Sequence, residues 1–532
     1  MPVLPSNIPL PLPTTPVVVR QATETLKIDA KLDDATVGER VLLVTLTDAA
    51  GTPVTGAKVT VALAMTNMDM GTSRPIVTER EGGVYAATLG FSMSGPWRAT
   101  IRAEHGGGTA ERAFTYDVKS ADGGTDAMPG MAGMEMGGMM GKLGPWPMTK
   151  EGSGTSWLPE SSPMFMKSLP NLGRYSVSLM GFGTLNYSDS GGRRGDGRFY
   201  SNSMPMLMAR RETGGGIIGI NLMGSLDPVF NGQYGYPDLF QTGETAHGNK
   251  LVDYQHPHDL LSELTISYSR PIGGGLNAFV YGGPVGEPAL GGPTFAHRPS
   301  GMDVPEAPIS HHWFDSTHIS WGVVTLGLNS PKWQLEGSVF NGHEPDENRY
   351  SPDPIALNSA STRVTYNPSR NLSFNTSYGY LNEPESTEPG EDQRRLTAAA
   401  IYSLPLRGGD NLSLTAAFGR NFTHHGESDA KILEGTYYRG RDSLFLRYEN
   451  VDKDELVGVP EGSYSVNKVL FGGIKNVSTR GGFDFGVGGY AGLYAFPGSL
   501  DRYYGSTPVT LGIFLRIRPS QMRHDMASMN GG

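Results

Sequence analysis

Six methionines crowd one short glycine-rich stretch of this 532-residue chain. Their thioether sulfurs are soft, uncharged ligands that favour Cu(I), and by the same softness Ag(I), over hard cations. Methionine more often fills a hydrophobic core, but a glycine-rich stretch has no core of its own to fill. The stretch therefore predicts capture of Cu(I) or Ag(I), with a ligand-free linker as the alternative; its methionines are Met128, Met131, Met134, Met136, Met139 and Met140.

A smaller group of methionines lies nearer the start of the chain, in "MTNMDMG". Met68 and Met70 alternate there, and alternate residues of a strand point to the same side. The pair predicts either a second soft-metal position or a partly buried strand edge.

Histidine is concentrated in one part of the chain, because eight of the twelve lie between residues 247 and 343. Acidic residues accompany them, and imidazole and carboxylate together suit Cu(II) or Zn(II). His256-Pro-His258 is the most specific element, since the proline fixes the backbone between two rings. The alternative is hydrogen bonding that folds the loops into a constriction or plug. The candidate ligands are His256, His258, Asp259, His297, His311, His312, His318 and His343.

Enzymatic signatures are poor. The chain has no cysteine nucleophile, no H-E-x-x-H zinc motif, no G-x-S-x-G elbow and no phosphate-binding loop. A hydrolytic metal centre built on His256, His258, Asp259 and Glu263 is the remaining catalytic hypothesis. We therefore expect binding or passage of an ion rather than covalent chemistry.

Composition restricts the elements that can position these side chains. Gly 73, Pro 38, Tyr 23 and Phe 20, with 18% charged residues, are typical of many short strands and turns. No run of about eighteen apolar residues is present, so no transmembrane helix is expected. The absence of cysteine excludes disulfides, and the net charge of -10 argues against a nucleic-acid partner.

Residues 24–119 alternate as the strands of an immunoglobulin-like β-sandwich do. Within them, "VTGAKVTVALAMTNMDMG" and "GGVYAATLGFSMSGPWRATI" resemble the YtkA-like periplasmic domains. Members of that family often occur with metal-efflux and copper-handling proteins, so the resemblance implies a metal context. Residues 1–23 are Pro-rich and lack the features of a signal peptide, so we expect the sequence to begin after a cleavage site.

From residue 173 the strand signal repeats to residue 518, and most strands are near the nine to eleven residues that a tilted membrane strand needs. The last strand alternates Leu511, Ile513 and Leu515 with more polar residues, which is the pattern of a lipid-facing barrel. Sixteen strands are predicted, near 173–187, 203–212, 216–226, 262–270, 276–283, 318–328, 332–341, 361–368, 371–380, 395–405, 411–420, 430–439, 441–451, 464–476, 482–494 and 508–518.

The connections between these strands alternate in length. Short turns follow the even strands, and long segments follow the odd ones, at 188–202, 227–261, 284–317, 342–360, 381–394, 421–429, 452–463 and 495–507. Such alternation is typical of an up-and-down barrel with brief periplasmic turns and longer external loops. An even number of strands then places both barrel ends on the periplasmic side.

Several segments of the barrel carry a family likeness: "GTSW", "GYPDLFQTGETAHGNKLVDYQHPHDL", "GEPALGGPTFAHRPS", "PEAPISHHWFDSTHISWGVVT" and "FNGHEPDENRY". They resemble an outer-membrane β-barrel family found near heavy-metal efflux genes. The resemblance runs from about residue 154 to 450. It implies an outer-membrane location and a metal context, and it assigns no activity to any residue.

The sequence thus predicts an all-β chain with five parts. These are a Pro-rich segment (1–23), a sandwich (24–119), a disordered Met/Gly/Pro-rich linker (120–172), an outer-membrane barrel (173–518) and a tail (519–532). The leading hypothesis is a barrel in contact with outer-membrane lipids that binds or passes copper, silver or related ions. The second is a plugged anchor whose periplasmic sandwich docks an efflux component. The metal-dependent hydrolase is third.

Overall fold

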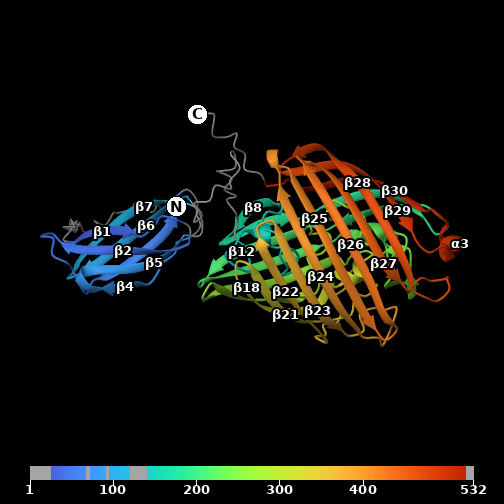
Figure 1. The fold of residues 1–532 in the computed structure, drawn as a ribbon, viewed down its shortest axis with the longest axis horizontal. Helices are drawn as coiled ribbons and strands as arrows, with labels where there is room; N and C mark the ends of the chain where they lie inside the picture. The colour runs from blue at the N-terminus through green and yellow to red at the C-terminus, as the bar shows by residue number, and fades with distance from the viewer. Residues whose placement is uncertain (1–25, 37, 67–71, 92–94, 120–140, 523–532) are drawn as a thin grey trace, which may run out of the picture. The chain divides into compact units, whose positions relative to one another are not determined.

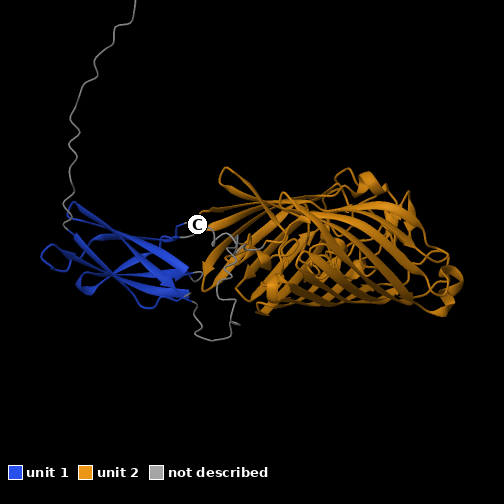
Figure 2. Cartoon of the chain, turned by 90° about the horizontal axis from the view of Figure 1, so that it is seen from above, with its two compact units in different colours: residues 1–137 blue, residues 138–532 orange. Residues whose placement is uncertain are grey.

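The computed structural model describes residues 26–36, 38–66, 72–91, 95–119 and 141–522. The chain divides into two compact units, Met1–Gly137 and Gly138–Gly532, shown in different colours in Figure 2. Nearly all described elements are strands (Figure 1). Among these residues, no helix has the length and apolar character needed to cross a bilayer.

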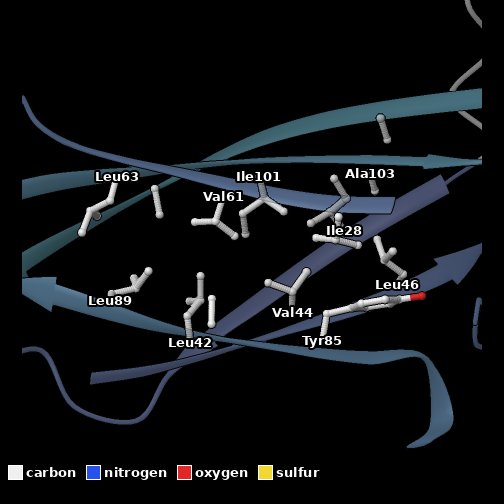
Figure 3. Packing of buried hydrophobic residues seen from close by; sticks show 14 of the residues in the cluster. Ile28, Leu42, Val44, Leu46, Val61, Leu63, Tyr85, Leu89, Ile101 and Ala103 are labelled. Atoms are coloured by element: carbon white, nitrogen blue, oxygen red, sulfur yellow. The ribbon is translucent and has the colours of Figure 1, made fainter. Parts of the chain in front are cut away.

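The described residues of the first unit form a sandwich of seven strands. One sheet has the order β1 (Leu26–Leu32), β2 (Gly38–Asp48), β5 (Val84–Phe91), β4 (Val77–Arg80), and the other β3 (Lys58–Met65), β6 (Gly95–His105), β7 (Gly108–Val118). This is the strand order of a constant-type immunoglobulin domain. Leu42 and Val44 of β2 point toward Val61 and Ile101 of the opposite sheet (Figure 3), so alternation along each strand builds one core. The predicted sandwich is confirmed.

The second unit is a closed antiparallel barrel. Strand β10 pairs with β30 from Gly183↔Ile517 to Ser190↔Thr510, which joins the first pass of the sheet to its last. The sheet's strands are β8 (Lys167–Leu172), β9 (Tyr175–Met180), β10 (Gly183–Ser190), β11 (Gly197–Ser203), β12 (Met206–Thr213), β13 (Gly216–Gly224), β18 (Leu261–Gly273), β19 (Leu276–Gly286), β20 (Ser320–Asn329), β21 (Trp333–Phe340), β22 (Ser359–Ser369), β23 (Leu372–Leu381), β24 (Gln393–Pro405), β25 (Asn411–Thr423), β26 (Gly426–Arg439), β27 (Asp442–Lys453), β28 (Tyr464–Arg480), β29 (Phe483–Ala495) and β30 (Val509–Pro519).

These nineteen strands make sixteen passes around the barrel. Strands β9 and β10 follow one another along the first pass, β11 and β12 along the second, and β8 forms a hairpin with β9 next to the seam. The predicted number of passes is therefore confirmed. The second pass begins at Gly197, six residues before the predicted position.

The barrel wall is apolar outside and polar inside. Leu511, Ile513 and Leu515 of β30 are exposed, whereas Arg516 and Arg518 on the other face are buried. The same inversion holds at Arg363, Arg395 and Arg447, which are fully buried on lumen-facing positions. A soluble core would place these two kinds of side chain the other way round, so the wall has the pattern of a membrane barrel.

The connections divide into a short-turn end and a long-loop end. One predicted long segment, 421–429, is wrong: only His424 and His425 separate β25 from β26. The pairing continues to Thr423↔Gly426 because the Arg420 guanidinium lies 2.6 Å from both a Glu427 and an Asp429 carboxylate oxygen across the ladder. The other long loops hold α1 (Asp227–Asn231), β14 (Tyr236–Pro237), β15 (Glu244–Ala246), β16 (Asn249–Leu251), β17 (Tyr254–Gln255), α2 (His311–Phe314), η3 (Ser316–His318), η5 (Gly498–Leu500) and α3 (Asp501–Tyr504).

Residues 141–166, called the lumen segment below, differ from the predicted linker. They include η2 (Met148–Lys150) and are mostly buried against the inner wall. Asn277 donates a hydrogen bond of 2.7 Å to the Leu143 carbonyl, and Gln334 one of 2.7 Å to the Thr155 carbonyl. The segment has few apolar residues of its own, but the polar wall satisfies its backbone, so it is ordered inside the barrel.

Candidate metal centre

Two long loops bring five predicted ligands together at the long-loop end. The loop before β18 supplies His256 and His258, and the loop before β20 supplies His311, His312 and His318. The ring centroids lie 6.3 Å apart for His256 and His311, 5.3 Å for His258 and His318, and 5.2 Å for His311 and His318. We call these five residues the imidazole cluster.

Buried ion pairs hold the loop 287–319 in the lumen. Its Arg298 lies 2.8 Å from Glu434 of β26 and 3.1 Å from its own loop's Asp315. Farther along, Asp303 lies 2.6 Å from both Arg516 and Arg518 of β30. Because an unpaired buried charge is costly, the pairs with Glu434, Arg516 and Arg518 fix the loop path against the wall. The position of His311 and His312 follows from these anchors.

Three side chains of this region meet with the geometry of a metal site. The ligand atoms of Glu244, His256 and His312 all lie within 4.8 Å of one another, and all three residues are buried. His312 Nδ1 is 3.2 Å from Glu344 Oε1, yet neither atom has a hydrogen bond of normal geometry. Glu385 is also near, 3.7 Å from the same nitrogen. Buried polar atoms whose contacts lack normal hydrogen-bond geometry are unusual, and a bound cation is one of their recognised causes.

Burial and neighbouring charges set the protonation of this group. Burial and the Arg349 cation lower the pKa of His256, so its imidazole is neutral and ready to bind a metal. Burial raises the pKa of Glu244 to about 8, against the opposing effect of Arg349. Burial lowers the pKa of His312, but attraction to Glu344 outweighs it and raises that pKa well above its usual value. The metal-free group therefore retains protons that an ion would displace.

The other three imidazoles have a fixed ring nitrogen. The Nδ1 atoms lie 2.8 Å from Asp227 in His258, and 2.7 Å from the Asp315 carboxylate in His311. In His318 the partner is the Asp315 carbonyl, at 2.7 Å. A carboxylate or carbonyl at Nδ1 leaves Nε2 as the ligating nitrogen, which is how metal-binding histidines are commonly oriented.

The remaining candidates lie elsewhere. His297 borders a separate methionine-lined cavity. His343 is half-buried, with its Nδ1 2.6 Å from the Glu344 carbonyl. Asp259 accepts a hydrogen bond of 3.1 Å from Trp321 Nε1, and Glu263 accepts one of 3.1 Å from Tyr281. The two carboxylates of the hydrolase hypothesis, Asp259 and Glu263, thus accept hydrogen bonds from Trp321 and Tyr281 rather than from His256. Met68, Met70, Met128, Met131, Met134, Met136, Met139 and Met140 lie outside the described residues.

Some residues of the site were missed from the sequence. Glu244 and Glu385 belong to two different loops and stand at no regular spacing from the histidines, so no signal identified them. A second group of ligand atoms, from Glu391, His424 and His425, lies at the β25–β26 turn and is largely exposed. The adjacent pair His424 and His425 was a signal for this group in the sequence. It was not recognised because a long loop was predicted at 421–429.

Comparisons with known proteins find similarities for parts of the chain. No curated protein matches the chain. Among solved structures, Pseudomonas putida OprB is 13% identical with a TM-score of 0.41, over 65% of this chain and 94% of its own. An anion-selective porin from Comamonas acidovorans is 15% identical with a TM-score of 0.38, over 65% and 99%. Salmonella typhi OmpF is 9% identical, with 0.40 over 66% and 100%. Residues 20–102 match the model of the YtkA-like family, as their sequence predicted.

Proposed function

We propose that this chain is an outer-membrane β-barrel protein that binds transition-metal ions at its long-loop end and passes them through its lumen, copper or silver being the preferred cargo. The exposed apolar face of strands such as β30 and the buried arginines of the lumen support the membrane location. On this reading the long-loop end faces outward, and the sandwich and the methionine stretch lie in the periplasm.

One observation carries the proposal: the buried group of Glu244, His256 and His312, with Glu344 beside it. Two imidazoles and carboxylates suit Cu(II) or Zn(II). A purely structural role would rest on the 3.2 Å ion pair of His312 Nδ1 with Glu344, but these atoms make no hydrogen bond of normal geometry. An ion at this position would satisfy them together.

The direct test is calorimetric titration of the full chain in detergent with Cu(II) or Zn(II). We expect His256→Ala combined with His312→Ala to weaken binding by at least about tenfold, since loss of supporting groups alone has that effect. His343→Ala is the matched control, because its ring lies on the same side of the barrel outside the imidazole cluster. Equal affinities in all three proteins would contradict the proposal.

The methionine stretch adds a second step to the proposed route. Its six thioethers suit capture of Cu(I) or Ag(I) on the periplasmic side. Replacing Met128, Met131, Met134, Met136, Met139 and Met140 by serine is expected to remove soft-metal sites from the full chain while leaving Cu(II) binding at the imidazole cluster intact. An unchanged Ag(I) stoichiometry would remove this step.

A second candidate function is a plugged anchor that docks a periplasmic partner, such as an efflux component, through its sandwich. The observation in its favour is the lumen segment, which hydrogen-bonds to the wall at Asn277, Gln334 and Asn367. Single-channel recordings separate the two functions. A barrel that never conducts an ion, with or without bound metal, favours the anchor, and metal-dependent conduction favours passage.

A further inference from the structure

A cavity of about 70 Å³ lies inside the barrel between the lumen segment and the wall. Thioethers border it from three directions: the lumen segment, the first two passes of the barrel, and the loop before β20. The seven methionines at its border are Met148, Met164, Met180, Met204, Met206, Met208 and Met302. We call this cavity the methionine chamber.

Strand pairing explains how so many sulfurs gather at one place. Met206 of β12 stands directly opposite Met180 of β9 on one side and opposite Met223 of β13 on the other. Directly paired residues of neighbouring strands share a face, with their Cβ atoms about 5 Å apart. Leu207 points to the exterior, so Met206 and Met208 both face the lumen. The row of sulfurs is therefore a property of the sheet.

His297 gives an independent sign of a ligand. His297 borders the chamber, and its Nε2 atom is shielded from solvent and has no hydrogen-bond partner. A neutral imidazole has one nitrogen that carries a free lone pair, and at Nε2 that lone pair can bind a cation. A buried polar atom without a partner calls for an explanation that apolar packing does not supply.

The charges around the chamber decide which kind of ion fits. Lys142, Arg516 and Arg518 border it, and both arginines lie 2.6 Å from Asp303, which offsets part of their charge. Glu151 accepts a hydrogen bond of 2.9 Å from the Leu143 backbone, and Glu263 one of 3.1 Å from Tyr281. With its carboxylates already engaged, the chamber offers mainly neutral sulfur and imidazole ligands. That donor set favours a singly charged soft cation over a hard divalent one.

We propose that the methionine chamber binds one soft monovalent cation, Cu(I) or Ag(I), through its thioethers and His297 Nε2. This site goes beyond the function proposed above, which places metal at the long-loop end and in the methionine stretch. It does not depend on that function. The competing explanation is that the methionines only fill an irregular space between loop and wall, as flexible side chains often do.

Leucine substitution separates the two explanations, because leucine conserves volume at little cost in stability but carries no sulfur. The background is the full chain with Met68, Met70 and the six methionines from Met128 to Met140 changed to serine, so that these other thioethers do not contribute. Ag(I) is titrated into this protein in detergent against a chromophoric chelator. We expect one tight site, and a loss of affinity of at least about tenfold in Met204→Leu/Met206→Leu/Met208→Leu.

Two controls keep the result clear. Met166→Leu changes a buried methionine of the lumen segment that does not border the chamber, and it should bind as the background does. If the triple variant fails to fold, the single variant Met208→Leu replaces it in the test. This variant changes a half-buried position and should also weaken binding. His256→Ala/His312→Ala should leave the Ag(I) site unchanged, so this test is separate from that of the imidazole cluster.

X-ray absorption of the Cu(I)-loaded background protein gives a readout of the ligands themselves. We expect sulfur neighbours together with one nitrogen, and loss of the nitrogen in His297→Leu. Unchanged Ag(I) affinity in the triple leucine variant, or a copper environment without sulfur, would overturn the proposal.

Discussion

Glu244 is expected to give the candidate metal centre its pH dependence. Its pKa is raised to about 8 by burial, and Arg349, at 3.1 Å, limits the rise. The neighbouring His312, paired with Glu344, also holds a proton well above the usual histidine pKa. A metal ion has to displace these protons, so binding weakens as pH falls.

We therefore predict that affinity for Cu(II) or Zn(II) increases from pH 6 to pH 9, by about tenfold per pH unit for each proton displaced. Glu244→Gln should bind more weakly at pH 9 and show a flatter profile, because one displaceable proton is gone. Calorimetry in buffers of different ionisation enthalpy counts the protons directly. A profile that is the same in both proteins would show that Glu244 takes no part.

For individual residues, the sequence predicted which residue types form the site better than it predicted which side chains contact one another. The density of histidine between 247 and 343 identified the five members of the imidazole cluster. It could not identify Glu244, because that contact depends on how loop 225–260 folds back. Met204, Met206 and Met208 did carry a signal, because their alternate spacing places them on one face of a strand. The sequence predicted that strand, from residue 203, but these methionines were not recognised as candidate ligands.

Among the elements, the lumen segment shows how composition can mislead. Its glycines and prolines are typical of a linker, and it lacks the apolar residues to form a core alone. It is ordered because side chains from β19, β20, β21 and β22 bond to its backbone, for example Asn329 to the Leu143 carbonyl at 3.1 Å. Those partners lie more than a hundred residues away along the chain, so no local sequence pattern predicts these hydrogen bonds.

The absence of cysteine allows a clean test of this packing. Thr155 is fully buried, and its hydroxyl accepts a hydrogen bond of 2.9 Å from Arg363. We predict that Thr155→Cys resists a membrane-permeant maleimide in the folded protein, whereas Arg407→Cys, at an exposed short turn, reacts fully. Labelling is read by mass after brief exposure. Equal reaction at both positions would mean that the segment does not stay in the lumen.

For the whole molecule, the alternation of connection lengths was the most informative pattern in the sequence. It predicted the sixteen passes and the end at which the histidines gather, since each depends only on local strand and turn signals. What fills the lumen depends instead on buried pairs between distant segments, such as Arg298 with Glu434. This is why the wall was predictable, whereas a plug of long loops was only one of two alternatives and the lumen segment was predicted as a linker.

The filled lumen leads to a prediction about conductance. We expect purified protein in a planar bilayer to show small or rare openings, because loop 287–319 and the lumen segment both occupy the barrel. Arg298→Ala should increase open time, since it releases the loop from Glu434 of the wall. Steady, large conductance in the unaltered protein would contradict the occlusion described here.

The position of the lumen segment also restricts how the barrel is assembled. The segment precedes β8 and β9 in the chain, yet its backbone bonds to strands that are synthesised much later. The wall closes only when β10 pairs with β30, the last strand of all. The segment can therefore make these bonds only when those later strands are in place, so the order of the lumen's contents depends on the wall around them.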